Sequence, residues 1–422
     1  MAEIKYWLWL AMVFGPGSRR IWETISFCGT AMEAYFYLTT DGSAANLTDA
    51  EKRAIDSIDL SKAAEHIEFC RRKGISLVSY DSKDYPPQLR HIYDPPAVLY
   101  YRGNISCLKG TRTVTTVGTR HATNYGLEAA HRVCADLARN GFVIVSGFAL
   151  GSDIATHMAA VSVNRPTACV LGCGVDVDYP RDNVVYRDRI LNCGGVFISE
   201  YPPGTRPLPQ NFPKRNRILA ALGMVTVVFE ASARSGSLIT ADLAATHGRE
   251  VFSLPPADIF SKAFSGNIEL LRWGATPLYS IEDVMECFLI GGALDEEIRS
   301  EQTADISTFG YESSLRTDRD DPLEEIKATA GKVRPRRQKA KTGKKSPEIQ
   351  EEIKDEKNTF TAKDELTELQ RTIFSKIKNG TAHADALAQE LGMNSDELMT
   401  ELTELEILGA VRSLPGKMYE IL

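Results

Sequence analysis

The sequence has no excess of basic residues. Its 422 residues include 49 Lys and Arg against 56 Asp and Glu, which gives a formal net charge of -7. A chain of this length is expected to form about two to four domains of roughly 100–200 residues each. A uniformly basic surface is therefore excluded, and any nucleic-acid site must be a local basic patch on an acidic protein.

The sequence also lacks the features of disulfide scaffolds and of membrane proteins. None of its eight cysteines forms a CxxC pair, which excludes a zinc ribbon. We expect the cysteines to be small buried side chains of a protein in a reducing compartment. The longest apolar run, residues 6–14, is far shorter than the ~20 residues that a spanning helix needs. Glu3 and the following Gly15-Pro16-Gly17 do not fit an export signal. We therefore expect a cytoplasmic protein without a membrane segment.

Motifs of several enzyme classes are missing. The sequence has no GxxxxGK[ST] loop and no GxGxxG after its first predicted strand, so neither an NTPase nor a dinucleotide site is predicted. Asp153 and His157 share a helical face, but no nucleophile lies beside them, which favours a structural hydrogen bond over a catalytic dyad. Cys169 and Cys173 lack metal-ligand spacing. No cofactor or metal is predicted.

Apolar runs rich in Val and Ile alternate with helical patterns in residues 86–291. The runs are residues 113–117, 142–146, 168–171, 196–199, 224–229 and 250–254, and helical patterns between them include residues 125–140, 153–163 and 236–247. Such alternation predicts an α/β fold with a parallel sheet covered on both faces.

The segments on either side differ from this core. Residues 1–85 have helical patterns, and the Gly15–Gly17 turn either presents N–H groups to a phosphate or is simply a tight turn. Residues 292–360 are charged and poor in apolar residues, which predicts a disordered linker. The basic run of this linker is either a solvated spacer or a nucleic-acid tether.

The pattern of residues 361–422 predicts three helices and a hairpin, an arrangement like that of a winged helix. Its third helix, residues 395–408, is acidic, so we expect this domain not to read duplex DNA.

Glycine, serine and basic residues follow the predicted strands of the core. Residues 118–120 (GTR) follow the first strand, residues 146–153 (SGFALGSD) the second and residues 172–174 (GCG) the third. Residues 200–217, which end in NFPKRNR, follow the fourth, and residues 230–237 follow the fifth. Each loop alone is an ordinary helix-entry turn. Because ligands of open parallel sheets bind outside the carboxyl ends of the strands, all five together predict one site.

Anion binding is the chemistry that this edge offers. Glycines let backbone N–H groups approach a phosphate, and helix N-termini add partial positive charge. Full charges come from Arg120, Lys214, Arg215, Arg217 and Arg234, and hydroxyl donors from Ser235, Ser237 and Thr240. Phe212, inside the basic stretch, either stacks on an unpaired base or fills the underside of its loop.

Five long motifs resemble the bacterial DNA-processing protein A (DprA, also called Smf) family. They are VGTRHATNYG from Val117, SGFALGSDIATH from Ser146, LGCGVDVDYP from Leu171, SEYPPGTRPLPQNFPKRNRILAAL from Ser199 and EASARSGSLITADLAATHGREVFSLP from Glu230. The resemblance implies a helical N-terminal domain (residues 1–85, SAM- or helix-hairpin-helix-like), an extended Rossmann-like core (86–291) and, after the linker, a C-terminal winged-helix-like domain (361–422).

The same resemblance implies a function. Members of this family bind single-stranded DNA without enzymatic activity, protect incoming strands in natural transformation and recombination, load the RecA recombinase and act as homodimers. The motifs and the loop after the fifth strand together give the predicted DNA-binding residues Gly118, Thr119, Arg120, Ser146, Gly147, Asn211, Phe212, Lys214, Arg215, Asn216, Arg217, Arg234, Ser235, Gly236 and Ser237.

An enzyme is the alternative interpretation. Rossmann-like phosphoribohydrolases of nucleotide monophosphates have a similar glycine-rich edge with a glutamate after a strand. Glu200 and Glu230 would then be acid/base or ribose-binding groups. The PGGxGT-type loop of those enzymes is absent, and we expect Glu230 to pair with nearby arginines instead.

Overall fold

The computed structural model describes residues 3–42, 45–110, 112–290, 368–377, 382–393, 398, 401–402, 405, 411–414 and 418–421. The chain forms two compact units, Met1–Arg337 and Gln338–Leu422, which are considered separately. The predicted linker, residues 292–360, lies outside the described residues, and so does most of the predicted acidic helix.

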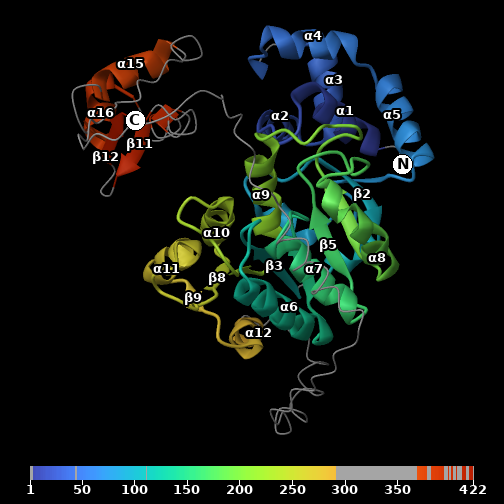
Figure 1. Cartoon of the computed structure of the whole chain (residues 1–422). Coiled ribbons are helices and arrows are strands. Elements are labelled where there is room, and N and C mark those ends of the chain that lie inside the picture. The colour runs from blue at the N-terminus through green and yellow to red at the C-terminus, as the bar shows by residue number, and fades with distance from the viewer. Residues whose placement is uncertain are drawn as a thin grey trace, which may run out of the picture. The chain divides into compact units, whose positions relative to one another are not determined.

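A nine-stranded sheet forms the centre of the described part of the first unit, in the order β1-β2-β6-β5-β4-β3-β7-β8-β9 (Figure 1). Strands pair in parallel from β6 to β9, whereas β1 and β2 add antiparallel at one edge. The strands are β1 (Ser76–Ser79), β2 (Val98–Gly103), β3 (Thr113–Val117), β4 (Val143–Ser146), β5 (Thr167–Val170), β6 (Val196–Ser199), β7 (Val225–Val228), β8 (Glu250–Ser253) and β9 (Thr276–Pro277). The predicted α/β class with a parallel sheet is confirmed.

Helices cover both faces of this sheet, which is why its central strands are apolar throughout. One face packs on α6 (Asn124–Arg139), α7 (Ser152–Ser162), α8 (Arg187–Asn192) and α12 (Ile281–Ile290), and the other on α9 (Asn211–Leu222) and α10 (Gly236–Thr246). Helix α11 (Ser265–Arg272) follows β8 and precedes β9. All five residues of β3 are buried, as expected for a strand in the middle of the sheet.

Five helices precede the sheet: α1 (Ile4–Phe14), α2 (Arg20–Cys28), α3 (Ala31–Thr40), α4 (Asp49–Ser57) and α5 (Leu60–Arg72). Trp7, Leu8 and Trp9 of α1 are the centre of a hydrophobic cluster that also includes Val98 and Tyr100 of β2. The N-terminal helices are therefore packed on the antiparallel edge of the sheet. Strand β1 lies ahead of residue 86, so the sheet begins within the segment predicted to be helical.

The described part of the second unit contains α15 (Glu368–Ile377), β10 (Ala382–His383), α16 (Ala384–Leu391), β11 (Val411–Leu414) and β12 (Met418–Ile421). Strands β11 and β12 pair antiparallel, which confirms the predicted hairpin, and β10 pairs with β12. Ile373, Leu402 and Val411 share one small core.

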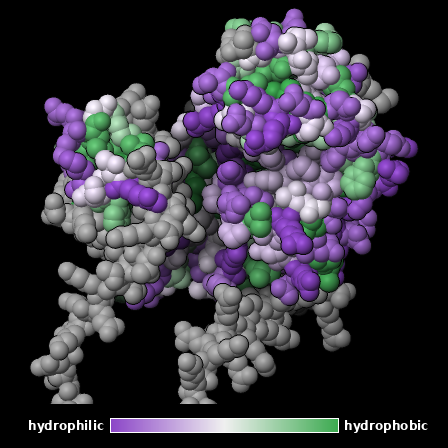
Figure 2. Space-filling view, turned by 90° about the horizontal axis from the view of Figure 1, so that it is seen from above, coloured by the Kyte–Doolittle hydropathy of each residue, from purple (hydrophilic) through white to green (hydrophobic). Residues whose placement is uncertain are grey.

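The face drawn in Figure 2 is largely hydrophilic where its residues are coloured. In Figure 2, hydrophobic residues lie as separate patches among hydrophilic ones. No helix among the described residues is long and apolar enough to cross a membrane.

Candidate nucleic-acid interface

The two central strands β3 and β7 create the topological feature that positions the site. Strand β3 pairs with β4 on one side and with β7 on the other. The strands from β4 to β6 are therefore added on one side of β3, and those from β7 onward on the other. Such a switch point leaves a crevice at the carboxyl ends of the strands. A groove of about 370 Å³ lies there, between the loops after β3 and β7 and the helices α9 and α10.

Most of the predicted loops reach this groove. Its lining includes Gly118, Thr119, Arg120, Phe212, Arg215, Asn216, Ser235, Gly236 and Ser237. Gly147 lines a smaller adjoining cavity of about 40 Å³, which also includes Arg120, Phe212 and Arg215. Four stretches that lie apart in the sequence thus meet at one place.

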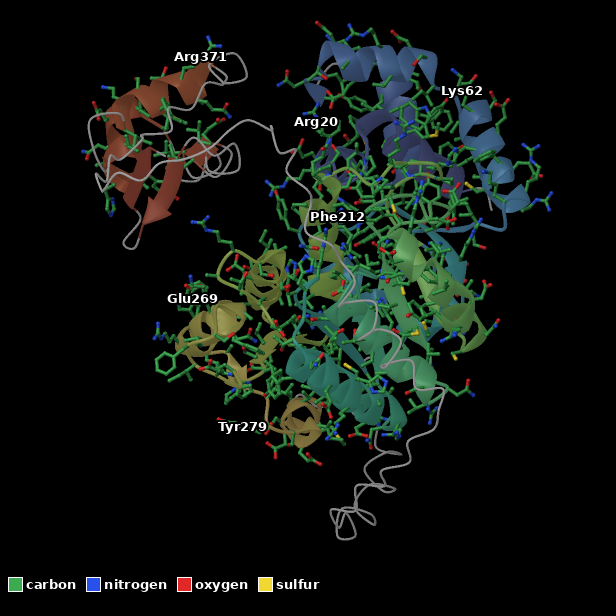
Figure 3. All side chains as sticks on the ribbon, in the orientation of Figure 1. Arg20, Lys62, Phe212, Glu269, Tyr279 and Arg371 are labelled. Atoms are coloured by element: carbon green, nitrogen blue, oxygen red, sulfur yellow. The ribbon has the colours of Figure 1, made fainter. Side chains whose placement is uncertain are left out.

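Helix α9 decides which residues of the NFPKRNR stretch face the groove. The sequence analysis treated this stretch as a loop, whereas the structure makes it the first two turns of a helix (Figure 3). A helix turns by about 100° per residue, so its side chains point in different directions. Phe212 and Asn216, four residues apart, line the groove, whereas exposed Lys214 does not.

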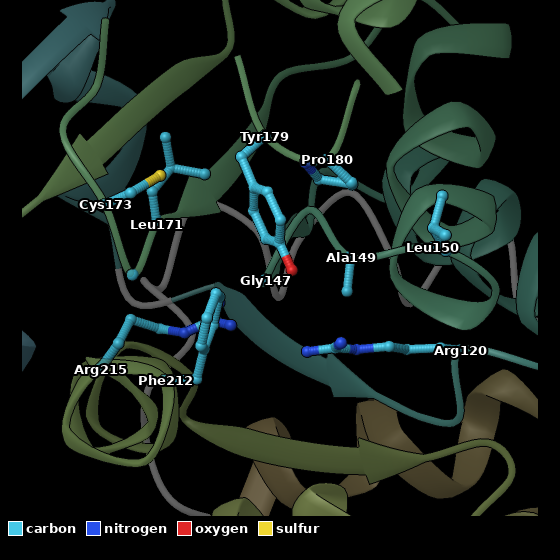
Figure 4. Close-up of a pocket in the computed structure, with 11 residues that line it drawn as sticks. Arg120, Gly147, Ala149, Leu150, Leu171, Cys173, Tyr179, Pro180, Phe212 and Arg215 are labelled. Carbon is cyan, nitrogen blue, oxygen red and sulfur yellow. The ribbon is translucent and has the colours of Figure 1, made fainter. Parts of the chain in front are cut away.

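A cluster of two arginines and an aromatic ring joins the groove to the small cavity. The guanidinium carbons of Arg120 and Arg215 lie 5.7 and 6.0 Å from the centre of the Phe212 ring. Figure 4 shows Arg120 extending across the pocket toward Phe212 and Arg215. Tyr179 lies 5.7 Å from Phe212, centre to centre. Attraction between cations and aromatic faces holds this cluster together, and its exposed member, Arg120, is free to meet a phosphate.

Arg215 supplies positive charge from beneath the surface. Its side chain is buried, and its Nη1 donates to the carbonyl of Val170 at 2.6 Å. Burial lowers the pKa of Arg215, and the nearby Asp153 carboxylate opposes that shift. A Cβ on Gly147 would lie closer to the Arg215 guanidinium than real Cβ contacts come, so a larger residue there requires the guanidinium to shift.

The N-terminus of α10 faces the groove from the other side. Ser235 caps the helix by accepting a hydrogen bond from the N–H of Ser237. The unpaired N–H groups of such a terminus and its partial positive charge favour a phosphate. Arg234, just before the cap, is exposed but does not line the groove. The arrangement thus offers backbone donors opposite the aromatic cluster.

Three of the predicted DNA-binding residues have side chains that are buried and bonded within the fold, away from the groove lining. Ser146 is fully buried and donates to the Thr116 carbonyl at 2.6 Å. Asn211 is buried, and its amide donates to the carbonyl of Arg206 at 3.5 Å. Arg217 is buried, and its guanidinium is paired with Glu200 and Asp94.

The Arg217 ion pairs connect three distant parts of the chain. Its Nη2 lies 2.8 Å from both carboxylate oxygens of Glu200, and its Nε lies 3.0 Å from Asp94. Burial disfavours the charge on Arg217, but Glu200 and Asp94 more than offset it, so the pKa of Arg217 is raised. Glu200 also accepts the N–H of Gly17 at 3.0 Å. That N–H is thus engaged by a carboxylate, which favours the tight-turn interpretation of Gly15–Gly17.

The two glutamates of the alternative enzyme interpretation both accept hydrogen bonds from residues of the fold. Glu230 accepts hydrogen bonds from the N–H and hydroxyl of Thr123 at 2.9 and 2.8 Å. Glu230 forms no ion pair with any described arginine, so the prediction that it pairs with a nearby arginine is wrong. Glu200 is the glutamate that pairs with an arginine, Arg217. Asp153 and His157 do not bond each other: His157 contacts Thr167 at 2.7 Å and Asp153 accepts from the N–H of Ala149.

Sequence reasoning missed Tyr179, which lines the small cavity beside Phe212. It lies in the motif LGCGVDVDYP, whose polar and aromatic end was a usable signal. It also missed Asp153 as the neighbour of Arg215, because a buried arginine with a carboxylate partner has no signature in one sequence.

Comparisons with known proteins identify relatives of this chain in sequence and in fold. The family model for DNA recombination-mediator protein A matches residues 76–289, and that for the DprA winged helix domain matches residues 358–417. DNA processing protein DprA of Bacillus subtilis is 39% identical over 216 residues, 51% of this chain and 72% of that protein. DNA processing protein DprA of Streptococcus pneumoniae is 42% identical over 204 residues, 48% of this chain and 71% of that protein. The X-ray structure of DNA processing protein A from Streptococcus pneumoniae superposes with a TM-score of 0.58 at 32% identity, covering 66% of this chain and 95% of that one.

Proposed function

Because this chain belongs to the DNA recombination-mediator protein A family, we propose that it binds single-stranded DNA in the groove between α9 and α10. The observation that carries the proposal is the Arg120–Phe212–Arg215 cluster opposite the N-terminus of α10. Phosphates meet Arg120 and the backbone donors, while an unpaired base stacks on Phe212. A duplex keeps its bases stacked on each other and cannot offer one to the ring.

Binding of this kind is dominated by phosphates and does not depend on base sequence. Each neutralised phosphate releases counterions, so affinity falls steeply with salt. The experiment is fluorescence anisotropy with oligo-dT and with a duplex of equal length across a salt series. We expect tight, salt-sensitive binding of the single strand and weaker binding of the duplex. Equal affinity for both would contradict the stacking role of Phe212.

Substitution assigns the site. The double variant Arg120→Ala/Lys214→Ala should weaken binding to all sequences alike, because phosphate contacts carry no sequence information. The matched control is Arg165→Ala, an exposed arginine just before β5 at the opposite, amino-terminal edge of the sheet. A double variant that binds as tightly as the parent would refute the assignment.

The proposed function involves no catalysis. Glu200 is bonded to Arg217 and Gly17, and Glu230 to Thr123, so neither carboxylate is presented in the groove lining. We expect no hydrolysis of nucleotide monophosphates by the purified protein. Turnover that disappears in Glu230→Gln would establish the alternative enzyme instead.

We further propose that the bound strand is protected and passed to the RecA recombinase during natural transformation, as the family resemblance implies. A RecA filament-assembly assay on single strands coated with single-strand-binding protein tests this step. The chain should accelerate assembly, and the Arg120→Ala/Lys214→Ala variant should not. Normal acceleration by that variant would separate RecA loading from the groove.

We also propose that the chain acts as a homodimer. Phe260, Trp273 and Tyr279, at the β8–β9 end of the sheet, are 86, 75 and 78% exposed. A contiguous patch of such side chains would be typical of an association surface. Sedimentation equilibrium should give a dimer mass, which Trp273→Glu should shift toward the monomer. A monomeric parent at micromolar concentration would refute the dimer.

A further inference from the structure

A second pairing of an arginine with an aromatic ring lies outside the groove. The guanidinium carbon of Arg19 lies 4.8 Å from the centre of the Tyr93 ring. Arg19 is exposed at the start of α2, and Tyr93 is 74% exposed in the loop before β2. Arg19 forms no ion pair with any described residue. The pair thus repeats the chemistry of Arg120 and Phe212, a positive charge against an open aromatic face.

The loop that carries Tyr93 is held firmly on both sides of it. Ile92 is buried, Asp94 accepts a hydrogen bond from Nε of Arg217 at 3.0 Å, and the carbonyl of Pro95 accepts one from the Trp22 indole at 2.9 Å. The exposed ring therefore has a fixed backbone. A ring presented in this way loses little conformational entropy when a base stacks on it.

The same ion pairs place Arg19 and Tyr93 beside α9. Arg217 of α9 bonds Asp94, next to Tyr93, and Glu200, which in turn accepts the N–H of Gly17 close to Arg19. Arg217 follows Phe212 by five residues, about 7.5 Å along the helix axis. Arg19 and Tyr93 are therefore adjacent in sequence to residues that are tied to α9 through Arg217 and Glu200.

Lys214 is an exposed cation on α9, outside the groove. It follows Phe212 by two residues and precedes Arg217 by three, so it lies on the side of α9 that Arg217 shares. Lys214 is exposed, forms no ion pair with any described residue and lies outside the groove lining. A phosphate leaving the groove toward Tyr93 is the ligand that this position suits.

We propose that Arg19 and Tyr93 form a second stacking platform for the same single strand, reached past Lys214; this rests on the proposed function of the groove. A strand that fills the groove continues past Lys214 and stacks one further base on the Tyr93 ring beside Arg19. The N-terminal helices thereby contribute directly to DNA binding. Because base stacking accepts every base, the platform extends the footprint without adding sequence preference.

A length series of oligo-dT from about 4 to about 16 nucleotides, the range of site sizes for single-strand-binding modules, tests the platform. Tyr93→Ala should leave the shortest oligonucleotides unaffected and weaken the longest by about 5- to 150-fold, the loss of one stacked base. Tyr93→Phe should restore binding of the longest. Phe27→Ala, which removes a 67% exposed ring of α2, is the matched control and should change neither.

The outcomes separate this proposal from the alternatives. If Tyr93→Ala weakens the binding of short and long strands equally, Arg19 and Tyr93 only support the structure of the groove, and the platform is refuted. No effect at any length would also refute the platform. Failure of the parent to bind even long oligo-dT would instead refute the groove itself. Photocrosslinking with 5-iododeoxyuridine gives an independent readout: the peptide containing Tyr93 should crosslink to long strands and not to short ones.

Discussion

The guanidinium carbon of Arg120 lies 5.7 Å from the centre of the Phe212 ring, although 92 positions separate the two residues in the sequence. Arg120 comes from the loop after β3 and Phe212 from the first turn of α9. Their contact joins the positively charged and the aromatic part of the groove. It is the contact on which the proposed binding mode depends most directly.

Phe212→Ala should lower the affinity for single-stranded DNA by about 1–3 kcal/mol, because one base loses its stacking partner. The salt dependence of binding should stay the same, since no phosphate contact is lost. Anisotropy titrations at several salt concentrations measure both quantities. A reduced slope of affinity against salt would contradict a pure stacking role. Phe27→Ala, on an exposed face of α2, should bind like the parent.

Arg217→Ala should lower the free energy of unfolding by about 3–5 kcal/mol, because Glu200 and Asp94 lose their common partner. Denaturant unfolding measures this loss. Arg132→Ala breaks an exposed pair with Glu128 and should cost at most about 1 kcal/mol. Unlike Arg120→Ala, Arg217→Ala should retain the parent's salt dependence of DNA binding. If the variant were as stable as the parent and its DNA binding depended less on salt, Arg217 would be a phosphate contact after all.

Gly147→Ala should impair DNA binding without removing any side chain that contacts DNA. The new Cβ would lie 2.3 Å from Nη1 of Arg215 and 2.7 Å from the Asp153 carboxylate. The Arg215 guanidinium must then shift, which disturbs its bond to the Val170 carbonyl and its position beside Phe212. Gly110→Ala, where an added Cβ meets nothing within 4 Å, is the matched control. Comparison of the two by thermal melting and anisotropy should show losses for Gly147→Ala alone.

His157 should make the protein less stable in acid. It is fully buried, and burial lowers its pKa to about 3, against about 6.5 in an unfolded chain. Between these values the unfolded chain binds the extra proton. Stability is therefore complete above about pH 6.5 and falls as the pH falls toward 3, by up to about 1.4 kcal/mol per pH unit.

Urea unfolding at pH 7.5 and 5 tests this pH dependence. His157→Gln removes the titrating ring, so the loss of stability between the two pH values should be smaller than in the parent. His121→Gln, at an exposed position, should leave the loss unchanged. An identical pH dependence in the parent and in His157→Gln would contradict the buried, neutral imidazole.

The strands that the sequence predicted are those buried on both faces. All six predicted runs are strands of the sheet, as expected for short runs rich in Val and Ile that are buried on both faces. Strands β1, β2 and β9 were missed. Strand β9 has two residues, and β1 and β2 lie at the antiparallel edge, where neither the run nor the alternation is long enough to recognise.

The chemistry of the binding edge was readable from local sequence, since each glycine-rich or basic loop directly follows its strand and parallel strands end on one side. Which basic residues face the groove was not. Helix α9 turns Phe212 and Asn216 toward the groove, Lys214 toward solvent and Arg217 into ion pairs with two carboxylates from other elements. Burial and ion pairing depend on what packs against a residue, and those neighbours come from parts of the chain that only the tertiary structure brings together.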